Sequence, residues 1–489
     1  MFKLFVILLF TTSTTALNFV PTQIHLALAG ISPTTASPTS MTAAWYTTDQ
    51  PTTPSFTQYG SQPNHLSLSS TATTTQYLSN HGYHHNALIN CSTLPIGQIV
   101  YYRVGSGATN TTWSPIFTFA TDKWAADAST QVSIFGDLGY EDSTTRRKQI
   151  FEIEPEQFTT DEKTTTDNND NNQKMNRKLG LTRDWSATFT RNAIESLKNR
   201  NILDMIFHAG DIGYADDSYL ISPFHLTYES IYNGYMNWFQ NITSIMPYMV
   251  TPGNHESECH SPACVINHKE YGLPLSNFTA FNTRWHMPSK ESGGHLNSNM
   301  WYSFNFGTVH YVSINSETDF VGAEEATTGD SHMKNLPAGG FGYDGEYMKW
   351  LENDLAKADA LRKNSSALGR QWLVAVGHRP YSDVVEAAKL FEKYNVDVYF
   401  AGHQHSYARS NGGTYGNKTI FVVAGGAGCD EMKQGKEEFV GTTAPADQAV
   451  NATSHRYSSG IMTTNTTHLK WELLDSVTGE VLDAFELSK

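Results

Sequence analysis

Residues 202–217, ILDMIFHAGDIGYADD, join a buried-strand pattern to two side chains of the kind that bind metals. The apolar run at the start is typical of a strand with both faces covered. It ends at Gly210, the carboxylate of Asp211 follows at once, and the phenol of Tyr214 comes three residues later. Glycine permits a sharp turn and a close approach of the backbone to a bound group. This stretch therefore predicts a strand whose tip places two oxygen ligands together.

The same pattern occurs five times between residues 130 and 410: an apolar run, a glycine and a metal-ligand type of residue. The five pairs are Gly136-Asp137, Gly210-Asp211, Gly253-Asn254, Gly377-His378 and Gly402-His403. One such pair is usually a turn, but five repeats after apolar runs indicate a shared site. Helical patterns separate the runs, which favours an α/β layered domain with functional groups beyond the carboxyl ends of its strands. We therefore expect five adjacent strands to bring these ligands, with Tyr214 and His405, to one rim.

Residues 20–122 show a different pattern, in which short β-rich runs such as SMTAAWYT and QIVYYRVG alternate with turn residues. This pattern is typical of an antiparallel sandwich. The chain becomes β-rich again after residue 410, with a predicted hairpin around SVTGE. The sequence therefore predicts an α+β multidomain fold: a β-sandwich at 20–122, an α/β domain at 130–410, and a β-rich C-terminal segment of that domain at 411–489.

The N-terminus, MFKLFVILLFTTSTTA, has one lysine, an apolar run and small residues that end at Ala16. These features predict a secretory signal peptide at residues 1–16, which is too short to span a bilayer. Eight N-x-S/T sequons fit glycosylation on a secretory route: Asn90, Asn110, Asn241, Asn277, Asn364, Asn417, Asn451 and Asn465. We therefore expect a secreted glycoprotein, or one delivered to an acidic vacuole or lysosome, without a membrane anchor.

Composition sets the expected partners and marks one insertion. The formal net charge of −15 argues against a nucleic-acid partner. An acidic protein that handles an anionic substrate needs a local source of positive charge. Residues 141–180 are rich in Thr, Asp, Asn and Glu, and they cannot bury enough apolar surface to offset their ordering entropy. We expect a mobile insertion there, either a solvated spacer or a lid.

The chain has only four cysteines, too few for a fold held together by disulfides. Cys259 and Cys264 enclose the sequence HSPA, and we expect them to form a local bridge. Cys91 and Cys429 lie in different predicted domains, and the sequence leaves their pairing open.

The ordered set GDxG, GDxxY, GNHE, GHRP and GHQH resembles the purple acid phosphatases of the metallophosphoesterase superfamily. The resemblance covers nearly the whole chain, because residues 20–122 look like their fibronectin-III-like domain, and MWYSFNFG (300–307) and YSSGIM…THLKWE (457–472) look like other recurring stretches. Tyr214 separates this branch from tyrosine-free relatives. The GNHE and GHRP motifs are most similar to the corresponding motifs of the fungal-type and long plant-type members.

The resemblance implies a dinuclear metal site. Ferric iron prefers anionic oxygen, and the implied ligands are Asp137, Asp211, Tyr214 and His405. A divalent ion (zinc, manganese or iron) suits imidazole and amide ligands, and the implied ligands are Asn254, His378 and His403, with Asp211 as the bridge. Two metals roughly 3.5–4 Å apart can hold a hydroxide and a phosphate for in-line displacement. They would also supply the positive charge that the acidic chain lacks.

The resemblance assigns His255, next to Asn254, to the substrate. Its implied role is catalytic: a hydrogen bond to the phosphate or the leaving oxygen that helps protonate the leaving group. Plant members carry further histidines shortly after the position of His378, but the stretch RPYSDVVEAAKLF contains none. His295, His332 and Arg379 stay open as substitutes.

The expected function is that of a secreted acid phosphatase, which hydrolyses small phosphate monoesters with a metal-bound hydroxide at an Fe(III)–M(II) site. A phosphodiesterase or nucleotide pyrophosphatase on the same core is the first alternative. The second is a non-catalytic adhesion protein with a decayed phosphatase domain, but the intact set of seven ligands argues against decay. The natural substrate, the divalent metal and the oligomeric state stay open.

Overall fold

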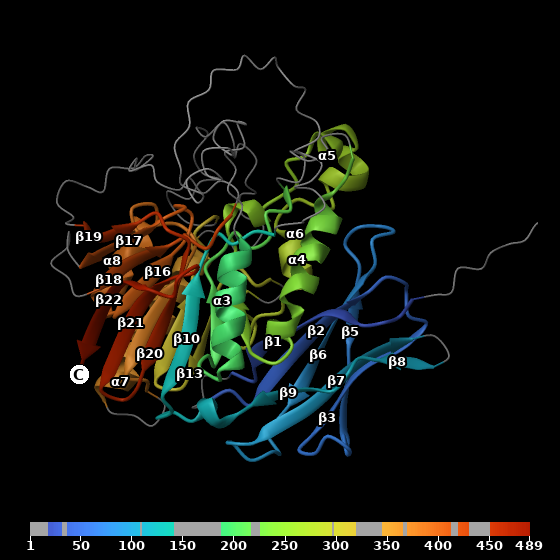
Figure 1. The fold of residues 1–489 in the computed structure, drawn as a ribbon, viewed down its shortest axis with the longest axis horizontal. Helices are drawn as coiled ribbons and strands as arrows, with labels where there is room; N and C mark the ends of the chain where they lie inside the picture. The colour runs from blue at the N-terminus through green and yellow to red at the C-terminus, as the bar shows by residue number, and fades with distance from the viewer. Residues whose placement is uncertain are drawn as a thin grey trace, which may run out of the picture.

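The computed structural model describes residues 18–31, 37–107, 110–140, 187–216, 225–295, 298–318, 345–364, 369–411, 419–429 and 450–489. The predicted signal peptide at 1–16, the predicted insertion at 141–180 and His332 therefore lie outside the described residues. Figure 1 shows a β-sandwich, drawn in blue, beside a larger layered part that contains the helices and the remaining strands.

The predicted N-terminal β-sandwich is present. Its strands are β1 (Thr22–Ala29), β2 (Ser40–Thr47), β3 (Thr53–Gly60), β4 (Leu68–Thr71), β5 (Thr73–Thr75), β6 (Tyr83–Asn90), β7 (Ile99–Gly107), β8 (Thr111–Trp113) and β9 (Phe117–Ala120). One sheet has the order β1-β2-β6-β5, and the other has the order β4-β3-β7-β8, with β9 also paired to β7. Val100, Tyr102 and Val104 of β7 are fully buried whereas Ile99 is exposed, which is the alternation of a strand with one covered face.

The larger part contains two sheets. The strands of the first, in the order β12-β11-β10-β20-β21-β22, are β12 (Tyr248–Val250), β11 (Met205–His208), β10 (Thr130–Phe135), β20 (Ser458–Thr464), β21 (His468–Asp475) and β22 (Val481–Ser488). The strands of the second are β13 (Tyr302–Phe306), β14 (Val309–Ser313), β15 (Trp372–Val376), β16 (Val398–Ala401), β18 (Ile420–Ala424), β17 (Tyr407–Asn411) and β19 (Val450–Ser454), in that order. The predicted hairpin around SVTGE joins β21 and β22.

The expectation of five adjacent strands is wrong in one respect, because the strands that precede the ligands belong to two sheets. β10, β11 and β12 are neighbours in the first sheet, and β15 and β16 are neighbours in the second. The sheets pack against each other through aromatic rings. The ring centres of Phe207 in β11 and Phe304 in β13 are 5.8 Å apart, and those of Phe400 in β16 and Trp471 in β21 are 4.6 Å apart. Because the strands that precede the ligands are buried on both faces in either sheet, they are apolar runs of the same kind, and the sequence pattern cannot assign such a strand to one sheet or the other.

Helices cover the sheets. They are α3 (Ala187–Asn199), α4 (Tyr228–Thr243), α5 (Pro262–Ile266), α6 (Thr279–Arg284), α7 (Glu346–Lys363) and α8 (Val385–Lys393), with the short 3-10 helices η1 (Asp122–Trp124) and η3 (Asn254–Glu256) and the π-helix η4 (His268–Gly272). α3 and α4 contact each other, as Figure 1 shows, and α4 also contacts β1 of the sandwich. Among the described residues, no helix is both long enough and apolar enough to cross a membrane.

Six of the eight sequon side chains can be located. Five are exposed and the sixth is half-buried: Asn90, Asn110, Asn241, Asn277 and Asn364 are exposed, and Asn465 is half-buried. The side chains of Asn417 and Asn451 lie outside the described part of the chain. The five exposed side chains are accessible to a glycosylating enzyme.

A buried ion pair of the larger part also forms hydrogen bonds to the sandwich. Arg284 of α6 is buried, and its Nη2 donates to Glu229 Oε2 at 2.8 Å. Its Nε donates to the hydroxyl of Tyr77 at 2.8 Å and its Nη1 to Gln23 Oε1 at 3.2 Å, and both partners belong to the sandwich. The guanidinium also lies 4.4 Å from the ring centre of Tyr232. These contacts satisfy a desolvated charge across the junction.

Arg284→Met should therefore destabilise the protein strongly, because it leaves Glu229 buried without its cation. Breaking a buried pair in this way costs about 3–5 kcal/mol of unfolding free energy. Urea unfolding followed by tryptophan fluorescence measures the loss, and Arg200→Met, at an exposed arginine, is the control. Equal stability of the two variants would contradict the role of the pair.

Candidate metal centre

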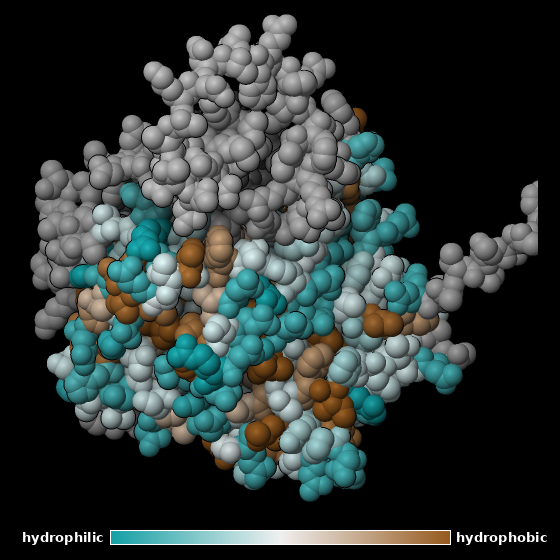
Figure 2. Space-filling view, viewed as in Figure 1, coloured by the Kyte–Doolittle hydropathy of each residue, from teal (hydrophilic) through white to brown (hydrophobic). Residues whose placement is uncertain are grey.

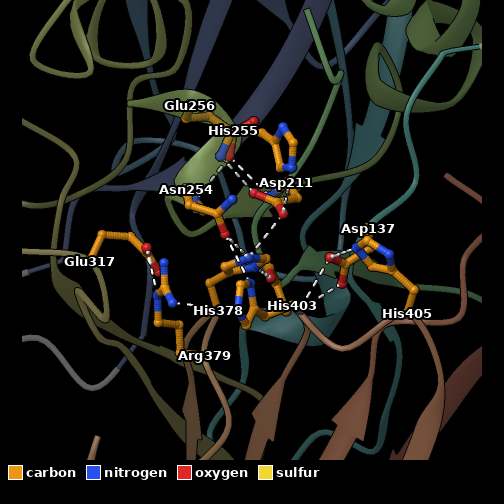
Figure 3. Close-up of polar contacts among 12 residues, drawn as sticks. Asp137, Asp211, Asn254, His255, Glu256, Glu317, His378, Arg379, His403 and His405 are labelled. Atoms are coloured by element: carbon orange, nitrogen blue, oxygen red, sulfur yellow. Dashed lines mark hydrogen bonds and ion pairs between the residues drawn. The ribbon is translucent and has the colours of Figure 1, made fainter. Parts of the chain in front are cut away.

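Two groups of side chains converge where the two sheets meet (Figure 3). The ligand atoms of Asp211, His378 and His403 lie within 4.8 Å of one another, and so do those of Asp137, Asp211 and His405. Asp211 belongs to both groups, which is the position a bridging carboxylate requires. Among the described residues, these two aspartates are the acidic side chains of the two groups.

The two remaining predicted ligands each join one group. Asn254 Oδ1 lies 3.0 Å from His378 Nε2 and 2.9 Å from His403 Nδ1. The hydroxyl of Tyr214 lies 3.1 Å from His405 Nε2 and 3.3 Å from Asp137 Oδ1. The structure therefore brings all seven predicted ligands together, and it divides them into a group with the amide and a group with the phenol.

His378 is oriented by a backbone carbonyl. Its Nδ1 lies 2.8 Å from Ala209 O, and because a carbonyl oxygen only accepts, Nδ1 carries the hydrogen. Its Nε2 faces Asp211 Oδ2 at 3.0 Å. Without a metal, burial opposes a charge on His378, but the carboxylates of Asp211 and Asp137 outweigh it and raise its pKa to about 9. A histidine that ligates a metal commonly donates its other ring N–H in this way.

Four of the seven candidate ligands have left-handed backbone conformations. Their φ angles are 62° at Asp137, 52° at Asp211, 50° at Tyr214 and 66° at His403. Such conformations cost of the order of 1–3 kcal/mol each in a residue other than glycine, and they persist where the surroundings enforce them. Here the backbone N–H of His403 donates to Asp137 Oδ2 at 2.9 Å. The hydrogen bond fixes the conformations of two of these residues together.

Glu256 fixes the tips of β11 and β12. Its buried carboxylate accepts hydrogen bonds from the backbone N–H groups of Asp211, Ile212 and Gly253, at 2.9, 2.8 and 2.9 Å. Burial, and then the charge of Asp211, raise its pKa. Sequence reasoning did not assign a role to this residue. Its only signal was the final letter of the GNHE motif.

The glycines before the ligands leave space for the ligand side chains. A Cβ at Gly253 would lie 2.2 Å from Asp211 Oδ1, and a Cβ at Gly402 would lie 2.4 Å from Asp137 Oδ2. At Gly253 the φ angle is −113°, which any residue adopts, so the requirement there is for space and not for a special backbone conformation. The recurring glycine of the sequence pattern is therefore part of the ligand cavity.

His255 lies beside the ligands without joining either group. Its Nδ1 is 2.9 Å from Asp216 Oδ2, its Nε2 is 3.8 Å from Asp211 Oδ2, and its ring centre is 4.2 Å from that of Tyr214. Its backbone N–H donates to Asp211 Oδ1 at 3.0 Å. The Nε2 side of the ring therefore faces the same space as the ligands, and the opposite nitrogen, Nδ1, is hydrogen-bonded to Asp216. The sequence analysis did not single out Asp216.

Three residues were considered as substitutes for the further histidines of the plant members. Of these, Arg379 lies beside the candidate metal ligands. Its Nη1 is 3.4 Å from His403 Nε2, and its Nε donates to the buried carboxylate of Glu317 at 2.9 Å (Figure 3). His295 packs against the ring of Trp301, with the ring centres 5.8 Å apart. His332 lies outside the described residues.

The cysteines divide into one bridge and two thiols. Cys259 and Cys264 form a disulfide with their Cα atoms 6.2 Å apart, as expected. Cys91 and Cys429 are buried free cysteines, so the open question of their pairing is answered. Cys429 lies within hydrogen-bonding reach of the side chains of His405 and Tyr214, which places a thiol behind the phenol-containing group.

The fold and the site together define a class of protein. A two-sheet α/β sandwich with two groups of Asp and His ligands that share one carboxylate has the form of a dinuclear phosphoesterase. The model of the calcineurin-like phosphoesterase family matches residues 132–407, and the chain belongs to that family. The purple acid phosphatase N-terminal domain matches residues 21–121, and the domain of the iron/zinc purple acid phosphatase-like protein C matches residues 418–484. The resemblance to the purple acid phosphatases is thus confirmed.

Relatives from fungi and mammals carry names of the same kind. Acid phosphatase from Aspergillus ficuum is 32% identical over 336 residues, which are 54% of this chain and 52% of that protein. Acid phosphatase A from Cryphonectria parasitica is 30% identical over 332 residues, 58% of this chain and 62% of that protein. Acid phosphatase type 7 from Homo sapiens is 26% identical over 452 residues, 84% of this chain and 78% of that protein. The chain therefore spans about half to three fifths of the length of the two fungal relatives.

The solved structure of PhoD is similar in fold. It aligns with a TM-score of 0.53 at 12% identity and covers 96% of this chain and 90% of its own. At this identity the similarity concerns the architecture alone.

Gly253→Ala should weaken metal binding, because a Cβ there would lie 2.2 Å from Asp211 Oδ1 and 2.4 Å from the Asp211 backbone nitrogen, so the Asp211 carboxylate and its strand tip must shift. Metal content after dialysis against a weak chelator measures the effect, and we expect a loss of more than half of the bound metal. Gly213→Ala, in the loop that carries Asp211, is a matched control, since a Cβ there would meet nothing closer than 3.5 Å. Full metal retention in the Gly253 variant would contradict the proposed ligand cavity.

Metal binding should weaken as the pH falls. In the metal-free protein His378 has a pKa of about 9, so below that pH it carries a proton that must leave when a metal binds. We expect release of about one proton from this group, which contributes about a tenfold gain in apparent Zn²⁺ affinity per pH unit between pH 6 and 8. Calorimetry in buffers with different ionisation enthalpies measures the proton. His378→Gln should remove this contribution, and an unchanged pH dependence in that variant would show that His378 is not a ligand.

Proposed function

We propose that this protein is an acid phosphatase that hydrolyses phosphate monoesters at a site for one ferric and one divalent ion. The observation that carries the proposal is the place of Tyr214, whose hydroxyl lies among Asp137, Asp211 and His405, apart from Asn254. A phenol has a pKa of about 10 in water, so only a strongly charged ion keeps it ionised in acid. A phenol and two carboxylates suit ferric iron.

The donor chemistry fits two metal ions of different hardness. Asp137, Asp211, Tyr214 and His405 would hold the ferric ion, and Asp211, Asn254, His378 and His403 would hold zinc, manganese or ferrous iron. These side chains would supply three oxygens and one nitrogen to the trivalent ion, and two oxygens and two nitrogens to the divalent one. When bound, the ions supply Lewis acidity and the positive charge that attracts a phosphate.

The side chains around the ligands would bind and orient the substrate. The Nε2 of His255 faces the ligand space, so it is suited to donate a hydrogen bond to a phosphate oxygen and to deliver a proton to the leaving oxygen. The Arg379 guanidinium, tied to Glu317, adds a fixed positive charge beside His403. Its planar donors match the oxygens of a phosphate. These two residues bracket the ligand groups and would set the position of the ester.

The proposal includes a secretory route and N-linked glycans. The apolar N-terminal stretch of residues 1–16 predicts a signal peptide, and five sequon asparagines are exposed. The names of the fungal relatives concern acid phosphatases, which agrees with work in an acidic compartment or outside the cell. Small phosphate monoesters are the proposed substrates.

The test compares p-nitrophenyl phosphate with bis-p-nitrophenyl phosphate on protein reconstituted with ferric iron and a divalent ion. We expect hydrolysis of the monoester at acidic pH and a violet colour from phenolate-to-iron charge transfer. Tyr214→Phe should lose the colour and retain iron less well, with residual hydrolysis. Tyr101→Phe, which alters the N-terminal sandwich, is the control. A preference for the diester would assign the protein to the phosphodiesterases, and a colourless loaded wild type would rule out the iron–phenolate.

A further inference from the structure

Asp216 lies buried behind His255 and is shared by a second histidine. Its Oδ2 lies 2.9 Å from His255 Nδ1 and 2.8 Å from His260 Nδ1. A carboxylate accepts and an imidazole N–H donates, so both rings direct an Nδ1–H at one oxygen. The other oxygen, Oδ1, has no hydrogen-bond partner among the described residues. The two imidazoles are therefore the side chains that compensate the desolvated charge of Asp216.

This arrangement determines where the His255 ring points. With Nδ1 held on Asp216, the opposite nitrogen of His255 faces Asp211 Oδ2 at 3.8 Å. The Nε2 of His260 instead faces a carboxylate outside both ligand groups, Glu258 Oε1, at 3.8 Å. The pair is thus asymmetric. One imidazole faces the ligand space, and the other can act on it only through the shared carboxylate.

The loop that carries His260 is fixed at both ends. His260 follows Cys259 directly, and the disulfide to Cys264 closes the loop around it. Ser261, which is buried, caps α5 by accepting a hydrogen bond from the Ala263 N–H at 3.2 Å. A short closed loop has few conformations to lose, so the His260 ring is held on Asp216 at little further entropic cost.

We propose that His260 is a positioning residue for His255: through Asp216 it holds the His255 imidazole at the metal ligands, and the Cys259–Cys264 disulfide holds His260. This inference rests on the proposed function, in which His255 serves the substrate oxygen. It gives the disulfide a part in the reaction, because three residues connect the bridge to the substrate: His260, Asp216 and His255.

The test compares two substitutions of His260. Asparagine places its amide Nδ2 where the histidine has Nδ1 and keeps the hydrogen bond to Asp216, whereas leucine removes it. His260→Leu should lower kcat for an alkyl phosphate about tenfold, part of the roughly 10²–10⁴-fold that general acid catalysis contributes. The loss should be smaller for p-nitrophenyl phosphate, whose leaving group needs no proton. His260→Asn should stay within about threefold of the wild type on both substrates.

Controls separate positioning from damage to the fold. His268→Leu removes an exposed histidine from η4 and should change nothing. Metal content should stay the same in all variants. If His260→Leu fails to fold, the double variant Cys259→Ser/Cys264→Ser takes its place, and we expect it to show the same selective loss on the alkyl ester. An equal loss on both substrates, or an Asn variant as poor as the Leu variant, would overturn the inference.

A readout that needs no turnover keeps the two proposals distinguishable. His255 Nε2 would donate to a bound phosphate, so His260→Leu should weaken the affinity of the metal-loaded protein for inorganic phosphate about fivefold, and His260→Asn should not. If the wild type hydrolyses neither ester, the proposed function fails, while this difference in phosphate affinity still supports the positioning role. Equal phosphate affinity in the wild type and both variants would overturn the positioning role by itself.

Discussion

The carboxylate of Asp211 belongs to both groups of ligand atoms, and neighbouring side chains and backbone groups fix its position and stabilise its charge. Burial opposes its charge, but the neighbouring His378 and His255 lower its pKa far below the usual range. The backbone N–H of His255 donates to Oδ1, and Glu256 accepts from the backbone N–H of Asp211 itself. Because a buried unpaired carboxylate is costly, His378 and the side chain and backbone N–H of His255 stabilise the charge of Asp211, and Glu256 fixes the backbone that carries it.

That constraint explains the glycines and the strained backbone together. A side chain at Gly253 would fill the space of Asp211 Oδ1, so the next strand must end in a residue without one. Asp211 and Tyr214 both take positive φ angles, which turns the chain sharply enough to aim two ligands from one strand tip. The cost is of the order of 1–3 kcal/mol for each residue, and the hydrogen bonds around the loop offset it.

The sequence was sufficient to predict which side chains meet at this site, because a glycine followed by a residue of the metal-ligand type leaves a local signature at each strand tip. It also predicted the sandwich and the α/β layers, since these follow from the period of apolar residues. It could not divide the ligand strands between two sheets, because a strand such as β11 and a strand such as β16 are equally apolar. Nor could it identify Asp216 or His260, whose roles depend on hydrogen bonds between loops that are 44 residues apart along the chain.

The pairing of β10 with β20 has a consequence for how the chain reaches this state. β10 is the first strand of the layered part, and its antiparallel neighbour begins at Ser458, with Val132 opposite Met462. Contacts of such long sequence separation form late, since the loop between them must close first. During synthesis, Asp137 and Asp211 therefore emerge long before the strand that completes their sheet. The nascent chain has an open edge at β10 for most of its translation, which is the period in which a chaperone would have to shield it.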